Sequence, residues 1–170
     1  DLFDVPDAII AELHADGRVV ICYFSAGSRE DWRPDADDFP PADIGADLDG
    51  WDGESWIDVT SEDVRAIMTA RLDLAVERGC DGVEPDNVDG YANDNGLGLT
   101  AADQLDYNQF LAAEAHTRGL SVGLKNDLDQ VATLEPHFDW ALNEECYGYA
   151  ECDMLLPFLQ AGKAVFHVEY

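Results

Sequence analysis

The chain has 170 residues, 46% of them hydrophobic, which is enough apolar material for one globular domain with its own core over residues 1–170. Its 37 acidic and 9 basic residues give a formal net charge of −28, which excludes the basic surface that nucleic-acid binding requires. The longest apolar run, residues 19–24, is far shorter than the ~20 residues needed to span a membrane, so we expect no membrane partner either.

The net negative charge also bears on the salt concentration in which the protein works. High charge with little apolar content is typical of disorder, but here the apolar residues recur regularly, which argues against disorder. Salt would screen the self-repulsion that loosens a folded state of this charge, so we interpret the composition as halophilic. The same charge favours a cationic ligand.

The first third of the chain predicts a helix, a strand and a long loop. Residues 5–16 carry apolar side chains at helical spacing, and residues 19–25 have the apolar content of a strand. Residues 28–55 are rich in Asp, Pro and Gly and predict a loop of unusual length. Such loops are functional or disordered, and the presence of Trp32 and Trp51 favours function.

The rest of the chain repeats one unit, a helix followed by a glycine and a short strand. A short strand at 56–59 leads into a helix that ends at Gly79, and the next helix runs from Thr100 to Gly119. The predicted strands fall near residues 2, 20, 57, 82, 123, 141 and 166.

Strands that alternate with helices in this way predict parallel βα units. The number of strands is close to the eight of a barrel, although a full barrel usually needs ~250 residues. We therefore predict an α/β fold, a (β/α)8 TIM barrel that is incomplete and lacks its first strand and last helix. An open doubly wound sheet is the alternative, but no Gly-x-Gly-x-x-Gly motif follows any strand.

The most informative stretch is residues 79–91, GCDGVEPDNVDGY. Alternation along a strand puts Glu84 and Asp86 on one face and Val83 and Pro85 on the other. The two carboxylates then lie at the C-terminal end of a strand, where α/β barrels place their chemistry. The alternative is an acidic surface loop on an acidic protein.

Polar side chains end nearly every other predicted strand as well. With the apolar residues facing outward, the inward set is Tyr23, Ser25, Asp58, Glu84, Asp86, Lys125, Asp127, Asn143, His167 and Glu169. Random surface acidity would scatter over both faces, so this convergence indicates a site. Opposed carboxylates without a nucleophilic Ser or Cys are typical of glycoside hydrolysis, in which one acid protonates the leaving oxygen. Aromatic residues that would stack on sugar rings are Trp32, Trp51, Tyr91, Tyr147 and Tyr149.

Four segments carry a resemblance to a known family: CYFSAGS from Cys22, residues 79–91, GLSVGLKND from Gly119, and NEECY from Asn143. They closely resemble the TIM-barrel endo-α-1,4-polygalactosaminidase family of glycoside hydrolases, and the similarity extends from the first residue to the last. The resemblance implies a (β/α)8 fold and hydrolysis of α-1,4-linked galactosamine polymers. We accordingly expect a secreted enzyme without a cofactor, whose partner is a cationic amino-sugar polysaccharide.

By motif, the resemblance matches Asp86 and Glu144 to the family's catalytic acidic pair, with their separate roles left open. Strict alternation from an inward Asn143 would place Glu145 in the site instead, so Glu145 is the second choice. The predicted substrate-binding residues are Tyr23, Ser25, Glu84, Asp89, Tyr91, Lys125, Asn126, Asn143, Tyr147 and Glu169. We predict no metal ligands.

The competing interpretation is a non-catalytic carbohydrate- or calcium-binding module on the same fold. Acidic and Asn residues between positions 81 and 94 offer many oxygen ligands. The ordered EF-hand pattern fails, however, because Val88 and Tyr91 fall where ligands are needed. Sugar binding without hydrolysis would tolerate the loss of Asp86.

The four cysteines have two different interpretations. Cys146 and Cys152 flank a tight loop that contains Gly148, and we predict a local disulfide between them, with two free thiols as the alternative. Cys22 and Cys80 lie in strand patterns and are interpreted as small buried hydrophobic residues. The spacing of the four disfavours a zinc site.

Overall fold

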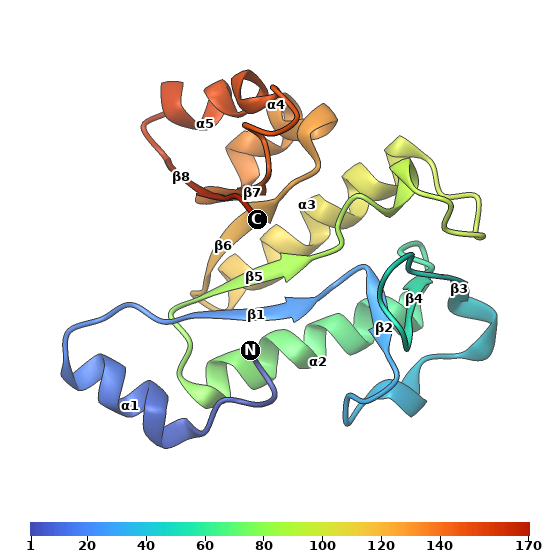
Figure 1. The fold of residues 1–170 in the computed structure, drawn as a ribbon. Helices are drawn as coiled ribbons and strands as arrows, with labels where there is room; N and C mark the ends of the chain where they lie inside the picture. Colours follow the sequence, from blue (N-terminus) through green and yellow to red (C-terminus); the bar gives the residue numbers. More distant parts are fainter.

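The computed structural model describes residues 1–170 and contains a central parallel sheet of five strands (Figure 1). The spatial order is β1-β5-β6-β7-β8, so the strands follow one another around the sheet in chain order. Their bounds are β1 (Ile21–Ser25), β5 (Gly82–Asp86), β6 (Ser121–Lys125), β7 (Trp140–Glu144) and β8 (Ala164–Val168). All four pairings are parallel.

Helices connect the parallel strands and cover one face of the sheet. They are α1 (Asp7–Ala15), α2 (Glu62–Arg78), α3 (Ala101–Thr117), α4 (Val131–Leu134) and α5 (Leu156–Gln160). The caps explain where the two long helices begin and end. The Ser61 side chain caps α2, Gly79 ends it with φ +82°, and Thr100 begins α3 with a reciprocal capping box. No helix combines the length and apolar character that crossing a bilayer requires.

This arrangement is part of a TIM barrel, as the sequence predicts. The alternative, a doubly wound sheet, is wrong, because such a sheet reverses its strand order and this one runs in a single direction. The outward side chains of the strands join the core beneath the helices, where Phe24, Val83 and Val122 are fully buried. Near residue 2 there is no strand, although Leu2 is buried and its amide donates to the Tyr23 carbonyl at 2.8 Å.

The segment between β1 and α2 departs most from the prediction. In place of a long loop and a barrel strand, it forms a separate antiparallel sheet of order β2-β4-β3, made of β2 (Ser28–Glu30), β3 (Ile44–Asp47) and β4 (Glu54–Ile57). Its strands have three or four residues each, too short to show a period-two pattern among Asp, Pro and Gly. We call residues 28–57 the insertion. It lies beside the C-terminal ends of the barrel strands (Figure 1).

Both cysteine pairs are joined. The predicted Cys146–Cys152 disulfide is confirmed. The interpretation of Cys22 and Cys80 as unpaired hydrophobic residues is wrong, because they form a second disulfide. β1 pairs directly with β5, with Cys22 beside Val83, and this brings Cys80 within reach. The sequence alone does not show that Cys22 and Cys80 are close, because the whole insertion separates β1 from β5 along the chain.

We expect the stability of the fold to depend on salt. With a net charge of −28, unscreened repulsion opposes the compact state, and the Debye length falls from about 10 Å at 0.1 M salt to about 3 Å at 1 M. The melting temperature should therefore rise as KCl is increased over this range. A melting temperature that stays constant or falls would contradict the halophilic interpretation.

Candidate active site

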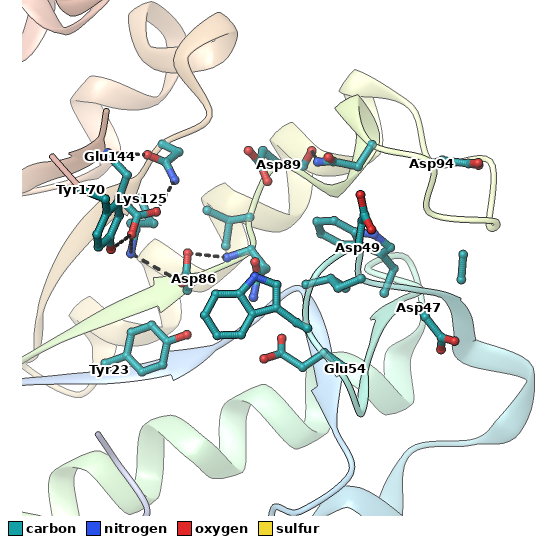
Figure 2. Close-up of a pocket in the computed structure, with 18 residues that line it drawn as sticks. Tyr23, Asp47, Asp49, Glu54, Asp86, Asp89, Asp94, Lys125, Glu144 and Tyr170 are labelled. Carbon is teal, nitrogen blue, oxygen red and sulfur yellow. Dashed lines mark hydrogen bonds and ion pairs between the residues drawn. The ribbon is translucent and has the colours of Figure 1, made fainter. Parts of the chain in front are cut away.

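A cavity of about 830 Å³ opens at the C-terminal ends of the parallel strands, within the size range of ligand sites. One wall comes from the barrel, where Tyr23 of β1, Asp86 of β5, Lys125 of β6 and Glu144 of β7 line it (Figure 2). The opposite wall comes from the insertion and includes Asp47, Asp49, Trp51, Glu54 and Trp56. We call this space the main cavity.

Lys125 holds the barrel side of the main cavity together. Its ammonium nitrogen lies 2.9 Å from Glu84 Oε1, 3.5 Å from Asp86 Oδ2 and 3.7 Å from Glu144 Oε1. Asp86 and Glu144 thus face the same nitrogen, and their oxygens cannot be farther apart than the sum of those two distances. This limit is compatible with the ~5 to 9.5 Å range of glycosidase carboxylate pairs.

The Glu144 carboxylate accepts two hydrogen bonds and forms one ion pair, with Lys125. Tyr170 donates its hydroxyl to Oε1 at 2.7 Å, and Asn126 donates Nδ2 to Oε2 at 3.2 Å. Burial alone would raise the pKa of this carboxyl. The two hydrogen bonds and the Lys125 ammonium outweigh burial and hold the pKa of Glu144 below its usual value. Glu144 is therefore ionised, the state that a nucleophile or a base requires.

Glu144 lines the main cavity and Glu145 does not. Register pairs Lys125 with Leu142, so Leu142 and Glu144 share the face of Lys125, while Asn143 and His167 lie on the opposite face, where Asn143 is buried and His167 is exposed. The predicted inward positions of Asn143 and His167 are thus wrong by one residue. The first three residues of β7 are apolar on both faces, so the sequence pattern does not show which residues of the strand face the barrel interior. Glu145 follows the strand with φ +59° and lines neither the main cavity nor the one beside it.

The main cavity is strongly acidic. Seven carboxylates line it against the single ammonium of Lys125, namely Asp47, Asp49, Glu54, Asp86, Asp89, Asp94 and Glu144. Burial and the neighbouring Asp86 carboxylate raise the pKa of Asp89 to about 6. Burial likewise raises the pKa of Glu54, against the hydrogen bond that Ser28 donates to it. Carboxylates in this arrangement attract cations.

Half of the catalytic and binding residues predicted from the sequence line the main cavity. Those that line the main cavity are Tyr23, Asp86, Asp89, Lys125, Asn126 and Glu144. Tyr91 and Asn143 line a smaller cavity next to it.

The other predicted binding residues do not line the main cavity. Ser25 is buried behind it and shares hydrogen bonds with Ser28 and Asn87, while Glu84 supports Lys125. Tyr147 is 80% exposed and donates its amide to Glu169, outside both cavities.

Two further predicted positions also lie elsewhere. Asp58 accepts hydrogen bonds from Thr60 near the start of α2. It lies away from the main cavity because the strand before it, β4, belongs to the insertion and not to the barrel. Trp32 lies outside the main cavity.

Sequence reasoning missed several cavity residues. Asp47, Asp49, Glu54 and Trp56 belong to the insertion, whose fold gives no periodic signal. Tyr170 is the last residue and follows β8, so only the fold brings it to Glu144. The one available signal was Trp51, which the sequence marks as an aromatic candidate and which lines the main cavity at 65% exposure.

We expect Asn126 to position Glu144. Besides its donor contact, Asn126 Oδ1 accepts from the Glu144 amide at 3.0 Å, and its backbone has φ +49°. Asn126→Asp keeps the acceptor and tolerates this conformation but loses the donor. Since hydrogen bonds to charged groups contribute about 1.5–3 kcal/mol, kcat should fall about tenfold or more. Without the donor the pKa of Glu144 rises, so the acidic limb of the pH–rate profile should move to higher pH.

The matched control for this prediction is Asn93→Asp, which adds one charge at an exposed position of the main cavity. It should leave the acidic limb in place. An Asn126→Asp enzyme whose pH profile coincides with that of the parent would contradict the positioning role.

A partial (β/α)8 barrel with a carboxylate pair at its C-terminal face defines the protein as a barrel enzyme of the glycoside-hydrolase type. The model of glycoside-hydrolase family GH114 matches residues 1–170, and the chain belongs to that family. No curated protein matches the sequence.

Solved structures agree with this assignment. Aspergillus fumigatus Ega3, solved in complex with galactosamine, is 54% identical with a TM-score of 0.98, and the match covers all of this chain and 68% of that one. The glycoside hydrolase domain of Pseudomonas aeruginosa PelA has a TM-score of 0.74 at 14% identity, with 98% and 73% of the two chains covered. Eubacterium rectale Amy13B has a TM-score of 0.65 at 15% identity, with 95% and 42% covered. The last two show the fold alone.

Proposed function

We propose that this glycoside hydrolase cleaves α-1,4-linked galactosamine-containing polysaccharide within the chain, using Asp86 and Glu144. The observation that carries the proposal is the pair of carboxylates facing one ammonium at the strand ends, in a cavity of otherwise acidic and aromatic character. Membership of family GH114 and the galactosamine complex of a 54% identical structure support the same substrate class.

The contacts suggest separate roles for the two acids. Glu144 accepts two hydrogen bonds, pairs with the Lys125 ammonium and is kept ionised, which suits a nucleophile or base. Asp86 accepts a hydrogen bond from the Asn87 amide at 2.8 Å and faces the Lys125 ammonium at 3.5 Å. Because Glu144 takes the role of nucleophile or base, we assign Asp86 the remaining role, proton donor to the leaving oxygen. Lys125 forms ion pairs with both carboxylates and so holds them in a fixed position relative to each other.

The charge of the main cavity supports a cationic substrate. A deacetylated galactosamine polymer carries an ammonium on each free-amine unit, and five carboxylates besides the catalytic pair line the cavity to receive such groups. The indole rings of Trp51 and Trp56, at the insertion wall, offer apolar faces for the sugar rings between those ammonium groups.

We also propose that the enzyme acts outside the cell. Both cysteine pairs form disulfides, which persist in oxidising compartments, and a polysaccharide of this kind is an extracellular polymer.

The calcium-binding alternative receives no geometric support. Three side chains of metal-binding type lie close enough together to share an ion: Cys146, Cys152 and His167. The two sulfurs of this group are joined in a disulfide. The carboxylates of the main cavity form no such group.

The test is a reducing-end assay on partially deacetylated galactosaminogalactan, with the fully N-acetylated polymer as the comparison. We expect new reducing ends from the deacetylated polymer and far fewer from the acetylated one. Binding of the deacetylated polymer without any new reducing ends would overturn hydrolysis and favour the non-catalytic carbohydrate-binding module.

A further inference from the structure

A chain of hydrogen bonds between side chains lies next to Asp86. Its members are Asn87, Ser25, Ser28 and Glu54. The two serines are fully buried and line neither cavity, so they cannot touch a substrate directly. Any effect that they have on the reaction must therefore pass through other residues.

The direction of each hydrogen bond in this chain can be assigned. Ser28 Oγ donates to Glu54 Oε2 at 2.8 Å, and a hydroxyl has only one hydrogen. The 2.5 Å contact between Ser25 Oγ and Ser28 Oγ must therefore use the hydrogen of Ser25. Ser25 Oγ in turn accepts from Asn87 Nδ2 at 2.9 Å and from the Ser28 amide at 3.1 Å. From Asn87 onward each side chain donates toward Glu54, so the chain requires an acceptor at that end.

The other end of the chain holds the Asp86 carboxylate. Asn87 donates its backbone amide to Asp86 Oδ1 at 2.8 Å, while the Lys125 ammonium faces Oδ2 at 3.5 Å. Asn87 has φ +59°, a left-handed conformation that residues other than glycine keep only where their surroundings support it. The hydrogen bonds from the Asn87 side chain to the two serines supply such support.

The backbone at Asp86 is fixed independently, which leaves the side chain as the part still to be oriented. The Asp86 carbonyl accepts from the amides of Ala26 and Gly27 at 2.8 and 3.1 Å. The carboxylate itself accepts from the Asn87 amide and from the Tyr23 hydroxyl. A proton donor must lie within hydrogen-bond reach of the leaving oxygen, and small displacements of a catalytic group lower the rate strongly.

We propose that Asn87 is the positioning residue of Asp86. Ser25, Ser28 and Glu54 fix the Asn87 side chain, and the Asn87 amide then holds the Asp86 carboxylate toward the leaving oxygen. This inference rests on the proposed function, in which Asp86 is the proton donor. It gives Glu54, on the insertion wall, a role at a barrel carboxylate (Figure 2). The side chains of the other cavity residues of the insertion make no hydrogen bond to this chain, so they can vary without disturbing Asp86.

The first experiment measures kcat and KM on partially deacetylated galactosaminogalactan for the parent, Ser25→Ala and Ser28→Ala. We expect kcat to fall about tenfold or more in each variant, with KM within about threefold of the parent, because neither serine lines a cavity. The matched control is Ser121→Ala. Ser121 Oγ accepts from Trp140 Nε1 at 3.0 Å at the start of β6, the opposite end of that strand from the main cavity, so its kcat should equal that of the parent.

The double variant Ser25→Ala/Ser28→Ala tests whether the two serines act as one unit. Breaking the chain at one link already releases Asn87, so kcat should fall no further than in the single variants. Losses that multiply to about 100-fold would contradict a single chain. Unchanged kcat in both single variants, with hydrolysis by the parent, would overturn the positioning role alone. No hydrolysis by the parent would overturn the proposed function and the positioning role with it.

A second comparison needs no substitution at a serine. Glu54→Gln and Glu54→Met both remove the charge from the main cavity, but only glutamine keeps an oxygen that can accept from Ser28. We expect kcat of Glu54→Gln to exceed that of Glu54→Met about tenfold, and thermal melts of both variants show whether they are folded. Equal kcat in the two folded variants would overturn the role of Glu54 as the terminal acceptor and with it the proposed chain.

Discussion

Asp86→Asn and Glu144→Gln should each abolish measurable hydrolysis, with kcat/KM lower by about 10³-fold or more. Either substitution replaces a carboxylate with an amide of nearly the same volume, so it removes the acid–base chemistry and leaves the packing in place. The melting temperature should therefore stay within a few degrees of the parent. The reducing-end assay and a thermal melt of each variant provide the two readouts.

The control for charge is Asp94→Asn, which lies exposed at the main cavity and touches neither catalytic candidate. It removes the same formal charge from the same cavity, so it should reduce kcat/KM only a few-fold, through weaker attraction of the substrate. Activity in Asp86→Asn equal to that of Asp94→Asn would remove Asp86 from the catalytic pair, and the same comparison applies to Glu144→Gln.

Loss of the Cys22–Cys80 disulfide should have the largest effect on stability. The two cysteines are 58 residues apart in sequence, and closing a loop of that size contributes about 4 kcal/mol in the chain-entropy model. The Cys22→Ala/Cys80→Ala variant should show that loss in its free energy of unfolding, measured with urea.

The matched comparison is Cys146→Ala/Cys152→Ala, where the sequence separation is only 6. The same model gives a smaller loss of about 2 kcal/mol for so short a loop. If removal of the Cys146–Cys152 disulfide destabilised the protein more than removal of Cys22–Cys80, the assignment of the long-range disulfide as the main covalent support of the fold would be wrong.

The parts of the fold that the sequence predicts are those with local signals. Thr60 or Ser61, Gly79 and Thr100 mark helix ends through their own side chains or backbone, and α2 and α3 lie between them, with Ser61 as the cap of α2. The stretch 79–91 predicts β5 and the position of Asp86 because its two faces differ clearly in polarity. Local chemistry is enough in each case.

The parts that the sequence does not predict depend on contacts between distant segments. The Cys22–Cys80 disulfide requires knowledge that β1 lies beside β5. The phase of β7 depends on its register with β6, because its own first residues are apolar on both faces. Tyr170 reaches Glu144 only because β8 lies beside β7.

The insertion and the barrel divide the main cavity between them, and this division bears on how such an enzyme changes over evolution. The barrel strands carry Asp86, Lys125 and Glu144, while the insertion carries Trp51 and the carboxylates of the opposite wall. The insertion has its own hydrogen-bonded sheet and meets the barrel at a tight junction, where Gly27 leaves no room for a side chain beside the Asn87 carbonyl. Mutations in the insertion can thus alter which polymer is accepted while the bond-breaking groups stay fixed, so substrate range and chemistry are free to diversify separately.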